Sequence, residues 1–250
     1  MQAPFSTVSE PSSASIHAAP ARRRMVDAPT RMFHAAFALC FLGAYVTAEG
    51  ERLRLLHVTF GYTLAGLLAF RVVYGLVGPR HARLSSLVRK LGGLLPWLAT
   101  LRLWRVAPRT ATVNWRQGQN LLLAWVIVML LGVVLPLTLS GYATYQEWGG
   151  DWLSEVHELI GNGFLAFVLA HVGLVLVLSV VRRRNLAGQM LSGRAEGSGP
   201  DLVTRNHGLL AALLLASVLS FWMYQWQQSP EGLVSDAAWR TLWQSEHDDD

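Results

Sequence analysis

Five long apolar segments limit what this chain can fold into. They cover, in approximate bounds, residues 32–48, 53–77, 121–139, 152–181 and 208–226. About 20 apolar residues in a helix, each rising about 1.5 Å, cross a hydrocarbon core of about 30 Å. Only 15% of the 250 residues are charged and 52% are hydrophobic, whereas an average soluble domain is about a quarter charged. The sequence therefore predicts an all-α integral membrane bundle with five spans.

The basic residues predict how the bundle is oriented. Segments 1–31, 78–118 and 182–206 lie on one side of the membrane if all five segments span it, and they hold 17 of the 21 Lys and Arg residues. Because basic loops stay in the cytoplasm, we expect a cytoplasmic N-terminus and a periplasmic C-terminus. The net charge of +5 then reflects topology, and we expect no nucleic-acid partner.

Composition divides the rest of the chain. We expect residues 1–28, rich in Ser, Ala and Pro, to be a disordered cytoplasmic segment, and residues 29–185 to form the main membrane domain. Within it, residues 78–118 form an amphipathic loop expected on the cytoplasmic membrane surface. Residues 186–226 supply a loop and the fifth helix, and residues 227–250 an acidic periplasmic tail. The single Cys40 excludes a disulfide framework, a Cys-rich zinc site and a protein-held iron–sulfur cluster.

Four of the eight histidines lie within the predicted spans. Ionisable residues at membrane depth are costly and usually functional. The predicted topology places His57 and His157 near the outer surface, and His34 and His171 near the inner one. His157 and His171 are 14 residues apart, which is about 21 Å along a helix and nearly the same face. The sequence therefore predicts an outer pair and an inner pair of histidines.

Each pair offers two imidazoles from different helices, as haem iron requires. Haem iron accepts one axial ligand on each face of the porphyrin, whereas a zinc site needs three or four ligands close together. No C-x-x-C-H motif for covalent haem is present. We therefore expect two b-type haems stacked across the membrane, with His34, His57, His157 and His171 as their iron ligands. Gly61 and Gly161, one turn after a histidine, leave room for a flat macrocycle, although glycine is common in membrane helices.

Three arginines are candidates for binding haem propionates. Arg71 follows His57 by 14 residues and so lies near the depth of the inner pair. It either offsets the propionates of the inner haem or extends to the cytoplasmic headgroups, and we favour the first interpretation. Arg52 and Arg54 are the corresponding candidates at the outer haem.

Three stretches of the chain carry a family resemblance. The runs PTRMFHAAFALCFLGAYVT (29–47), LHVTFGYTLAGLLAFRVVYGLVGPRHARL (56–84) and EVHELIGNGFLAFVLAHVGLV (155–175) resemble the bacterial cytochrome b561 family. Within it they are most similar to the b-type cytochrome subunits of membrane-bound nickel–iron hydrogenases. The resemblance covers about residues 26–185 and implies a four-helix core, two haems b on the four histidines, and a quinone beside one haem. The fifth helix and the acidic tail depart from that minimal pattern.

The resemblance and the topology together predict an electron-transfer subunit of the bacterial inner membrane. It would carry electrons between membrane quinone and a periplasmic partner, either a c-type cytochrome or hydrogenase subunits. The alternative is a superoxide:quinone oxidoreductase of the cytochrome b561 type, in which Arg52 and Arg54 attract the anion. A structural anchor without haem is a third class.

The quinone has two candidate sites. We favour the inner one, beside His171 with Arg71 and Arg31 nearby. The alternative is an outer site near His157 and Glu158, where the carboxylate accepts quinol protons. Both interpretations rest on the need for a polar group beside an apolar slot that holds the ring.

Overall fold

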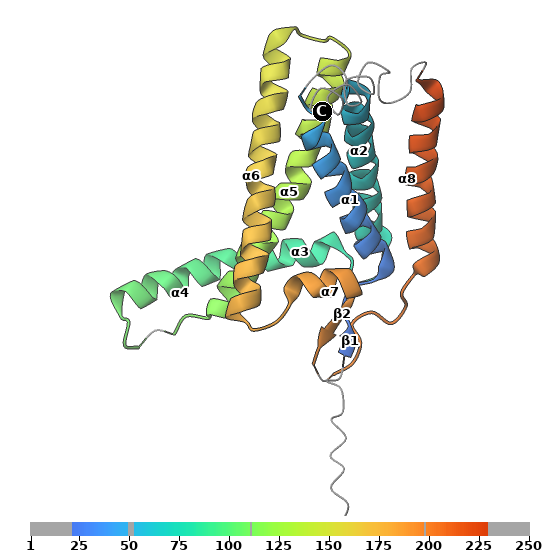
Figure 1. The fold of residues 1–250 in the computed structure, drawn as a ribbon. Helices are drawn as coiled ribbons and strands as arrows, with labels where there is room; N and C mark the ends of the chain where they lie inside the picture. Colours follow the sequence, from blue (N-terminus) through green and yellow to red (C-terminus); the bar gives the residue numbers. More distant parts are fainter. Residues whose placement is uncertain (1–21, 50–52, 111, 198, 230–250) are drawn as a thin grey trace, which may run out of the picture.

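The computed structural model describes residues 22–49, 53–110, 112–197 and 199–229. It is an all-α membrane bundle (Figure 1), as the sequence predicts. Two three-residue strands accompany the helices. The elements are β1 Arg22–Arg24, α1 Ala28–Val46, α2 Arg54–Val77, α3 Leu84–Leu91, α4 Leu94–Val106, α5 Trp115–Tyr145, α6 Asp151–Val181, α7 Leu186–Ser192, β2 Arg194–Glu196 and α8 Gly208–Gln228.

Four helices among the described residues are long and apolar enough to cross a membrane, namely α2, α5, α6 and α8. They correspond to four of the five predicted spans. The remaining predicted span is α1, with 19 residues, whose apolar stretch is shortened by Arg31 and His34 in its first two turns. That α1 spans the membrane stays a prediction. It runs beside α2 and α8 within the bundle (Figure 1).

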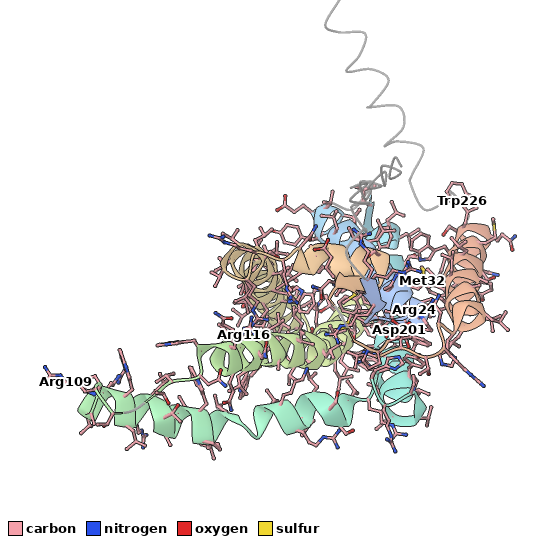
Figure 2. The ribbon with its side chains drawn as sticks, turned by 90° about the horizontal axis from the view of Figure 1, so that it is seen from below. Arg24, Met32, Arg109, Arg116, Asp201 and Trp226 are labelled. Carbon is pink, nitrogen blue, oxygen red and sulfur yellow. The ribbon has the colours of Figure 1, made fainter. Side chains whose placement is uncertain are left out.

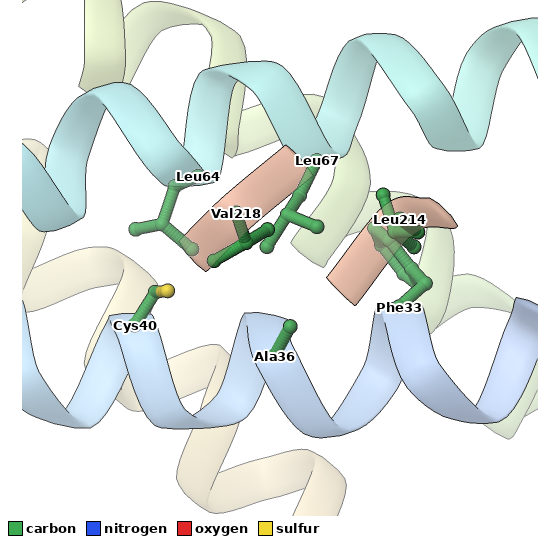
Figure 3. Close-up of a cluster of buried hydrophobic side chains, with 7 residues drawn as sticks. All are labelled: Phe33, Ala36, Cys40, Leu64, Leu67, Leu214 and Val218. Atoms are coloured by element: carbon green, nitrogen blue, oxygen red, sulfur yellow. The ribbon is translucent and has the colours of Figure 1, made fainter. Parts of the chain in front are cut away.

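A buried apolar cluster joins α1, α2 and α8. It consists of Phe33, Ala36, Cys40, Leu64, Leu67, Leu214 and Val218 (Figure 3). A polar contact adds to it, because the Trp222 indole N–H of α8 donates to the Thr63 hydroxyl of α2 at 2.9 Å. The fifth predicted helix is therefore packed into the bundle. On the other side of the molecule, α5 packs against α6 and α2.

Capping residues fix where two of the bundle helices begin. The Asp27 carboxylate accepts from the Thr30 backbone N–H at 3.1 Å, and Pro29 occupies the first turn of α1. The Asn114 side chain accepts from the Gln117 N–H at 3.0 Å at the start of α5. Both arrangements satisfy a backbone donor that has no partner within the helix.

The sequence analysis expects disorder as far as residue 28, but the structure describes an ordered chain from residue 22 onward. Residues 1–21 lie outside the described residues, but Arg22–Arg24 form β1, which pairs antiparallel with β2. The Arg24 N–H also donates to the Asp201 carboxylate at 2.6 Å, and both residues are labelled in Figure 2. Backbone pairing with a segment about 170 positions away orders this stretch, and local composition does not reveal such a partner.

Asp27 also anchors the basic end of the bundle. Its carboxylate is fully buried and accepts from the Tyr74 hydroxyl and from the His81 Nε2, the latter at 2.9 Å. Burial raises the pKa of Asp27, but the hydrogen bonds from Thr30, Tyr74 and His81 outweigh it and hold the pKa below its ordinary value. This cluster ties the start of α1 to the end of α2 and the loop after it.

The loop predicted as amphipathic contains α3 and α4. α3 lies across one end of the bundle, where α7 and the two strands also gather, and α4 continues outward past α6 (Figure 1). Arg89 and Lys90 lie in the last turn of α3, and large apolar side chains such as Leu95 and Leu103 of α4 are exposed. Residues 84–91 and 94–106 of the loop are thus helical, and the place of the loop on the membrane surface stays a prediction.

Candidate functional site

His57 of α2 and His157 of α6 face each other near one end of the bundle. The centres of their rings are 6.0 Å apart and the ring planes are nearly perpendicular, at 89°. Two imidazoles bound on opposite faces of one iron, with metal–nitrogen bonds of about 2 Å, have ring centres roughly 6 Å apart. The two rings of the outer pair, which the topology predicted to be neighbours, therefore lie at a separation that suits one metal ion bound between them.

Hydrogen bonds orient both imidazoles of the outer pair. The Nδ1 of His57 donates to the Ala44 carbonyl at 2.7 Å. The Nδ1 of His157 donates to the Leu137 carbonyl at 3.1 Å, and the Ser140 hydroxyl lies 3.1 Å from the same nitrogen. A carbonyl oxygen can only accept, so Nδ1 carries the proton in each ring, and in a neutral imidazole Nε2 then keeps its lone pair. This is the tautomer that coordinates a metal through Nε2.

A cavity of about 560 Å³ adjoins these two histidines. Its volume lies within the range of sites that hold small molecules or cofactors, about 300–1,000 Å³. Gly61 and Gly161 both line it. A Cβ atom added at Gly61 would have no neighbour within 4 Å, and one at Gly161 would meet only Leu137 Cδ1, at 3.8 Å. Both glycines thus border open space that a larger side chain would partly fill.

Gly141 of α5 is a site residue that the sequence analysis did not single out. A Cβ atom at this position would lie 2.8 Å from Cε1 of His157, closer than two carbons can approach without displacement. The absence of a side chain lets the His157 ring lie against α5. Because α5 carries no histidine, nothing in the sequence indicated that it shapes the site.

His34 of α1 and His171 of α6 form the second pair. The ring centres are 6.5 Å apart and the planes are inclined by 54°, so this separation also suits two ligands of one metal. The Nδ1 of His171 is buried and has no hydrogen-bond partner among the described residues. His34 is exposed. The inner pair thus has nearly the same spacing as the outer pair. Both rings of the outer pair are hydrogen-bonded, whereas the Nδ1 of His171 has no such bond among the described residues.

An aromatic cluster lies between the two pairs. Phe164 is fully buried and stands midway between His157 and His171 on α6. Its ring contacts those of Phe41 and Phe37 of α1, with centres 5.0 Å and 6.4 Å away. These rings fill the interior between the two histidine pairs and keep it apolar.

The arginines named from the sequence have different surroundings. Arg71 donates from Nη1 to the Ala82 carbonyl at 3.1 Å, so part of its guanidinium is engaged by the loop after α2. Arg54 lines the outer cavity, and its guanidinium lies over the Tyr145 ring, 5.5 Å from the ring centre. Arg52 lies outside the described residues. Binding of propionates by these residues stays a prediction.

Arg31 and Glu158, which the sequence analysis named for the two candidate quinone sites, lie in different parts of the structure. Arg31 donates from Nη1 to the Ser192 carbonyl at 3.2 Å, at the end of α7. Glu158 lines the outer cavity together with Asn162. The structure therefore brings Glu158 close to the outer histidines, whereas Arg31 points toward the segment after α7.

Comparison with known proteins gives one result. A family model described as prokaryotic cytochrome b561 matches residues 25–193. This range includes all four paired histidines and ends before α8. Neither the comparison with curated proteins nor the comparison with solved structures gives a match.

Proposed function

The chain belongs to the prokaryotic cytochrome b561 family, and from this premise we propose that it is a dihaem electron-transfer subunit. As a member of that family it is a membrane-integral b-type cytochrome that takes part in electron transfer. The proposal adds that His57 and His157 hold one haem b and that His34 and His171 hold a second. It also adds a route between a periplasmic partner and membrane quinone.

The geometry of the outer pair carries this proposal. Two imidazoles 6.0 Å apart have their Nδ1 protons engaged by carbonyl oxygens, so both Nε2 atoms are available as ligands. A cavity bordered by Gly61 and Gly161 lies beside them. A flat, apolar macrocycle with iron at its centre suits this combination, whereas a bare metal ion would need more ligands than two imidazoles.

Each haem, when bound, supplies a centre that gains or loses one electron. Each pair of histidines would hold one haem through two imidazoles, which would leave no open position on the iron for O₂. The backbone carbonyls of Ala44 and Leu137 fix the outer rings and raise their basicity as ligands. Phe164 keeps water from the region between the two pairs. These residues favour electron transfer over chemistry at an open iron.

We place the two ends of the route by the charge of the chain. The basic segments lie at the end of the bundle that holds α3, α7 and the strands, so this end faces the cytoplasm and the His57–His157 end faces the periplasm of a bacterial inner membrane. A periplasmic c-type cytochrome or a hydrogenase subunit would then contact the outer end. The acidic segment 227–250, expected to take part, lies outside the described residues except at its start.

The quinone site is proposed at the inner end, beside His171. Arg71 supports this choice, because its guanidinium lies near Asp27 and the loop after α2, at the end of the bundle that we assign to the cytoplasm. The outer site near Glu158 and Asn162 is the competing position, because these side chains line the cavity at His157. Arg71→Leu and Glu158→Gln, each checked for full haem content, distinguish the two.

The experiment uses the full chain in liposomes that contain a quinone. A chemically reduced c-type cytochrome is added outside, and quinone reduction is followed by absorbance. An inner site predicts that Arg71→Leu lowers turnover while Glu158→Gln changes it little. The reverse result would move the quinone to the outer end.

A second candidate function rests on Arg54. Its guanidinium lines the outer cavity, where a cation would attract superoxide to a site next to His57. In the liposome assay a superoxide:quinone oxidoreductase would reduce quinone with superoxide alone. Strict dependence on the added cytochrome would instead support the electron-transfer subunit.

A further inference from the structure

A basic pocket lies at the ends of α5 and α6, away from both histidine pairs. Its volume is about 290 Å³, and it is lined by Arg116, Asn120, Arg182, Arg184, Leu186 and Gln189. Three of these six residues are cationic and none is acidic. We propose that this pocket binds a phosphate group, and that an anionic phospholipid supplies it.

The position of Arg116 is the first argument. It lies in the first turn of α5, which begins at Trp115, where the helix dipole is positive and a cation is unfavourable. Arg182 is the C-terminal cap of α6, where a cation offsets the negative end of the helix dipole. Arg116 has no such role, because it lies at the positive end of α5. A bound anion offsets both the helix dipole and the guanidinium.

The geometry of Arg182 is the second argument. Its Nε donates to Gln119 Oε1 at 3.0 Å, and its Nη2 donates to Asn120 Oδ1 at 2.9 Å. These bonds hold the guanidinium across the gap between α6 and α5 without neutralising it. The ion pairs found among the described residues are Arg22 with Glu196 and His81 with Asp27, and neither involves this pocket. The guanidinium of Arg182 is thus held in place, and no acidic side chain within residues 22–49, 53–110, 112–197 and 199–229 pairs with the cations of this pocket.

The place of the pocket in the fold indicates the source of the phosphate. It lies where two apolar helices of 31 residues each end or begin, and Leu186 contributes an apolar wall. A phospholipid can put its phosphate among the arginines and leave its acyl chains along α5 and α6. Basic pockets between membrane helices on the cytoplasmic side are suited to anionic headgroups.

Binding to the purified full chain in a neutral detergent tests the proposal. The probes are short-chain phosphatidylglycerol, phosphatidylcholine with the same chains, and inorganic phosphate, each followed by native mass spectrometry. We expect phosphatidylglycerol to bind, phosphatidylcholine to bind at least about fivefold more weakly, and inorganic phosphate not to displace the lipid at equal concentration. Equal binding of the two lipids would overturn the proposal. Tight binding of inorganic phosphate alone would overturn the lipid as the source.

Three variants locate the site. Arg116→Gln and Arg184→Gln should each weaken phosphatidylglycerol binding about fivefold, as expected for one basic residue near a membrane surface. Arg109→Gln is the matched control, because Arg109 lies at the far end of the arm that α4 forms and Arg116 at the start of α5 (Figure 2). An equal loss in the Arg109 variant would show a diffuse basic surface and overturn the pocket. The comparison of the two lipids on the unchanged chain stands if a variant fails to fold.

Discussion

The two histidine pairs have almost the same spacing and very different surroundings. Their ring centres are 6.0 Å apart in the outer pair and 6.5 Å apart in the inner pair. Both outer rings are oriented by carbonyl oxygens, whereas the Nδ1 of His171 is buried without a partner among the described residues. The spacing is therefore set by helix packing, and the orientation of each ring is set separately by its neighbours.

This difference has a consequence for electron flow. A hydrogen bond from Nδ1 to a carbonyl makes the imidazole a more basic ligand, which favours the oxidised iron and lowers the reduction potential. We therefore expect the outer haem to have the lower midpoint potential. Electrons that enter from the periplasm would then pass downhill to the inner haem.

Removal of one histidine from each pair gives the largest expected effect. His157→Ala should remove the outer haem and His171→Ala the inner one, so that each variant retains about half of the haem absorbance of the unchanged protein. The measurement is the pyridine haemochrome absorbance per chain. His207→Ala, which removes an exposed histidine before α8, is the control and should keep both haems. Full haem in the His157 or His171 variant would break the pairing.

Gly141→Ala perturbs the outer pair alone. The added Cβ would lie 2.8 Å from the His157 ring, so the ring must move and the outer site should lose most of its haem, while the inner site keeps its own. Optical spectra of the purified variant measure the loss. Gly132→Ala on the same helix is the control, since a Cβ atom there has no neighbour within 4 Å. If both alanine variants have the same spectrum, the close approach of α5 is unimportant for the site.

Asp27→Asn should weaken the inner end of the bundle and leave the outer end unchanged. It removes the charge that accepts from Tyr74 and His81, and hydrogen bonds to a buried charged group contribute about 1.5–3 kcal/mol each. We expect a lower melting temperature in detergent and earlier loss of the inner haem on heating. Equal loss of both haems would show that the cluster stabilises the whole bundle.

The same cluster predicts a pH dependence. The pKa of Asp27 is below its ordinary value of 3.8 in the folded chain, so the stability that it contributes is present above about pH 3.8 and is lost as the pH falls through the folded pKa. The asparagine variant should lack this acid-induced loss. The check is the melting temperature of both proteins between neutral and acidic pH.

Ser140→Ala has the smallest expected effect. It removes the hydroxyl beside His157 Nδ1 but leaves the Leu137 carbonyl in place. We expect the midpoint potential of the outer haem to rise by less than about 60 mV, which corresponds to a tenfold change in a one-electron equilibrium. Redox titration measures it, with Ser217→Ala on α8 as the control. A change at the inner haem instead would contradict the separation of the two sites.

Hydropathy suffices to predict the four long apolar helices α2, α5, α6 and α8, and topology suffices to predict which histidines lie side by side. A spacing of 14 residues places His157 and His171 on one helix face, and alternation of basic and acidic segments orders the helices across the membrane. Both signals are local in the sequence. The structure places His57 beside His157 and His34 beside His171, as those signals predict. Their role as haem ligands stays a proposal.

The remaining features depend on contacts between distant segments. Gly141 matters only because α6 places His157 against it, and Phe164 only because α1 supplies Phe37 and Phe41. His81 lies outside the predicted spans, yet its imidazole contacts the carboxylate of Asp27, which is 54 positions away. No local pattern indicates such partners. The basic residues Arg116 and Arg182 likewise served only to predict the orientation of the bundle. The sequence does not indicate that they line the same pocket.

The haem content of the purified, unmodified chain tests the central claim most directly. The measurement combines a pyridine haemochrome assay, scaled to protein concentration, with an EPR spectrum of the oxidised protein. A dihaem cytochrome with four histidine ligands gives two haems b per chain and signals from two low-spin centres with two imidazoles each. One haem per chain, or a high-spin centre with an open axial position, would contradict it.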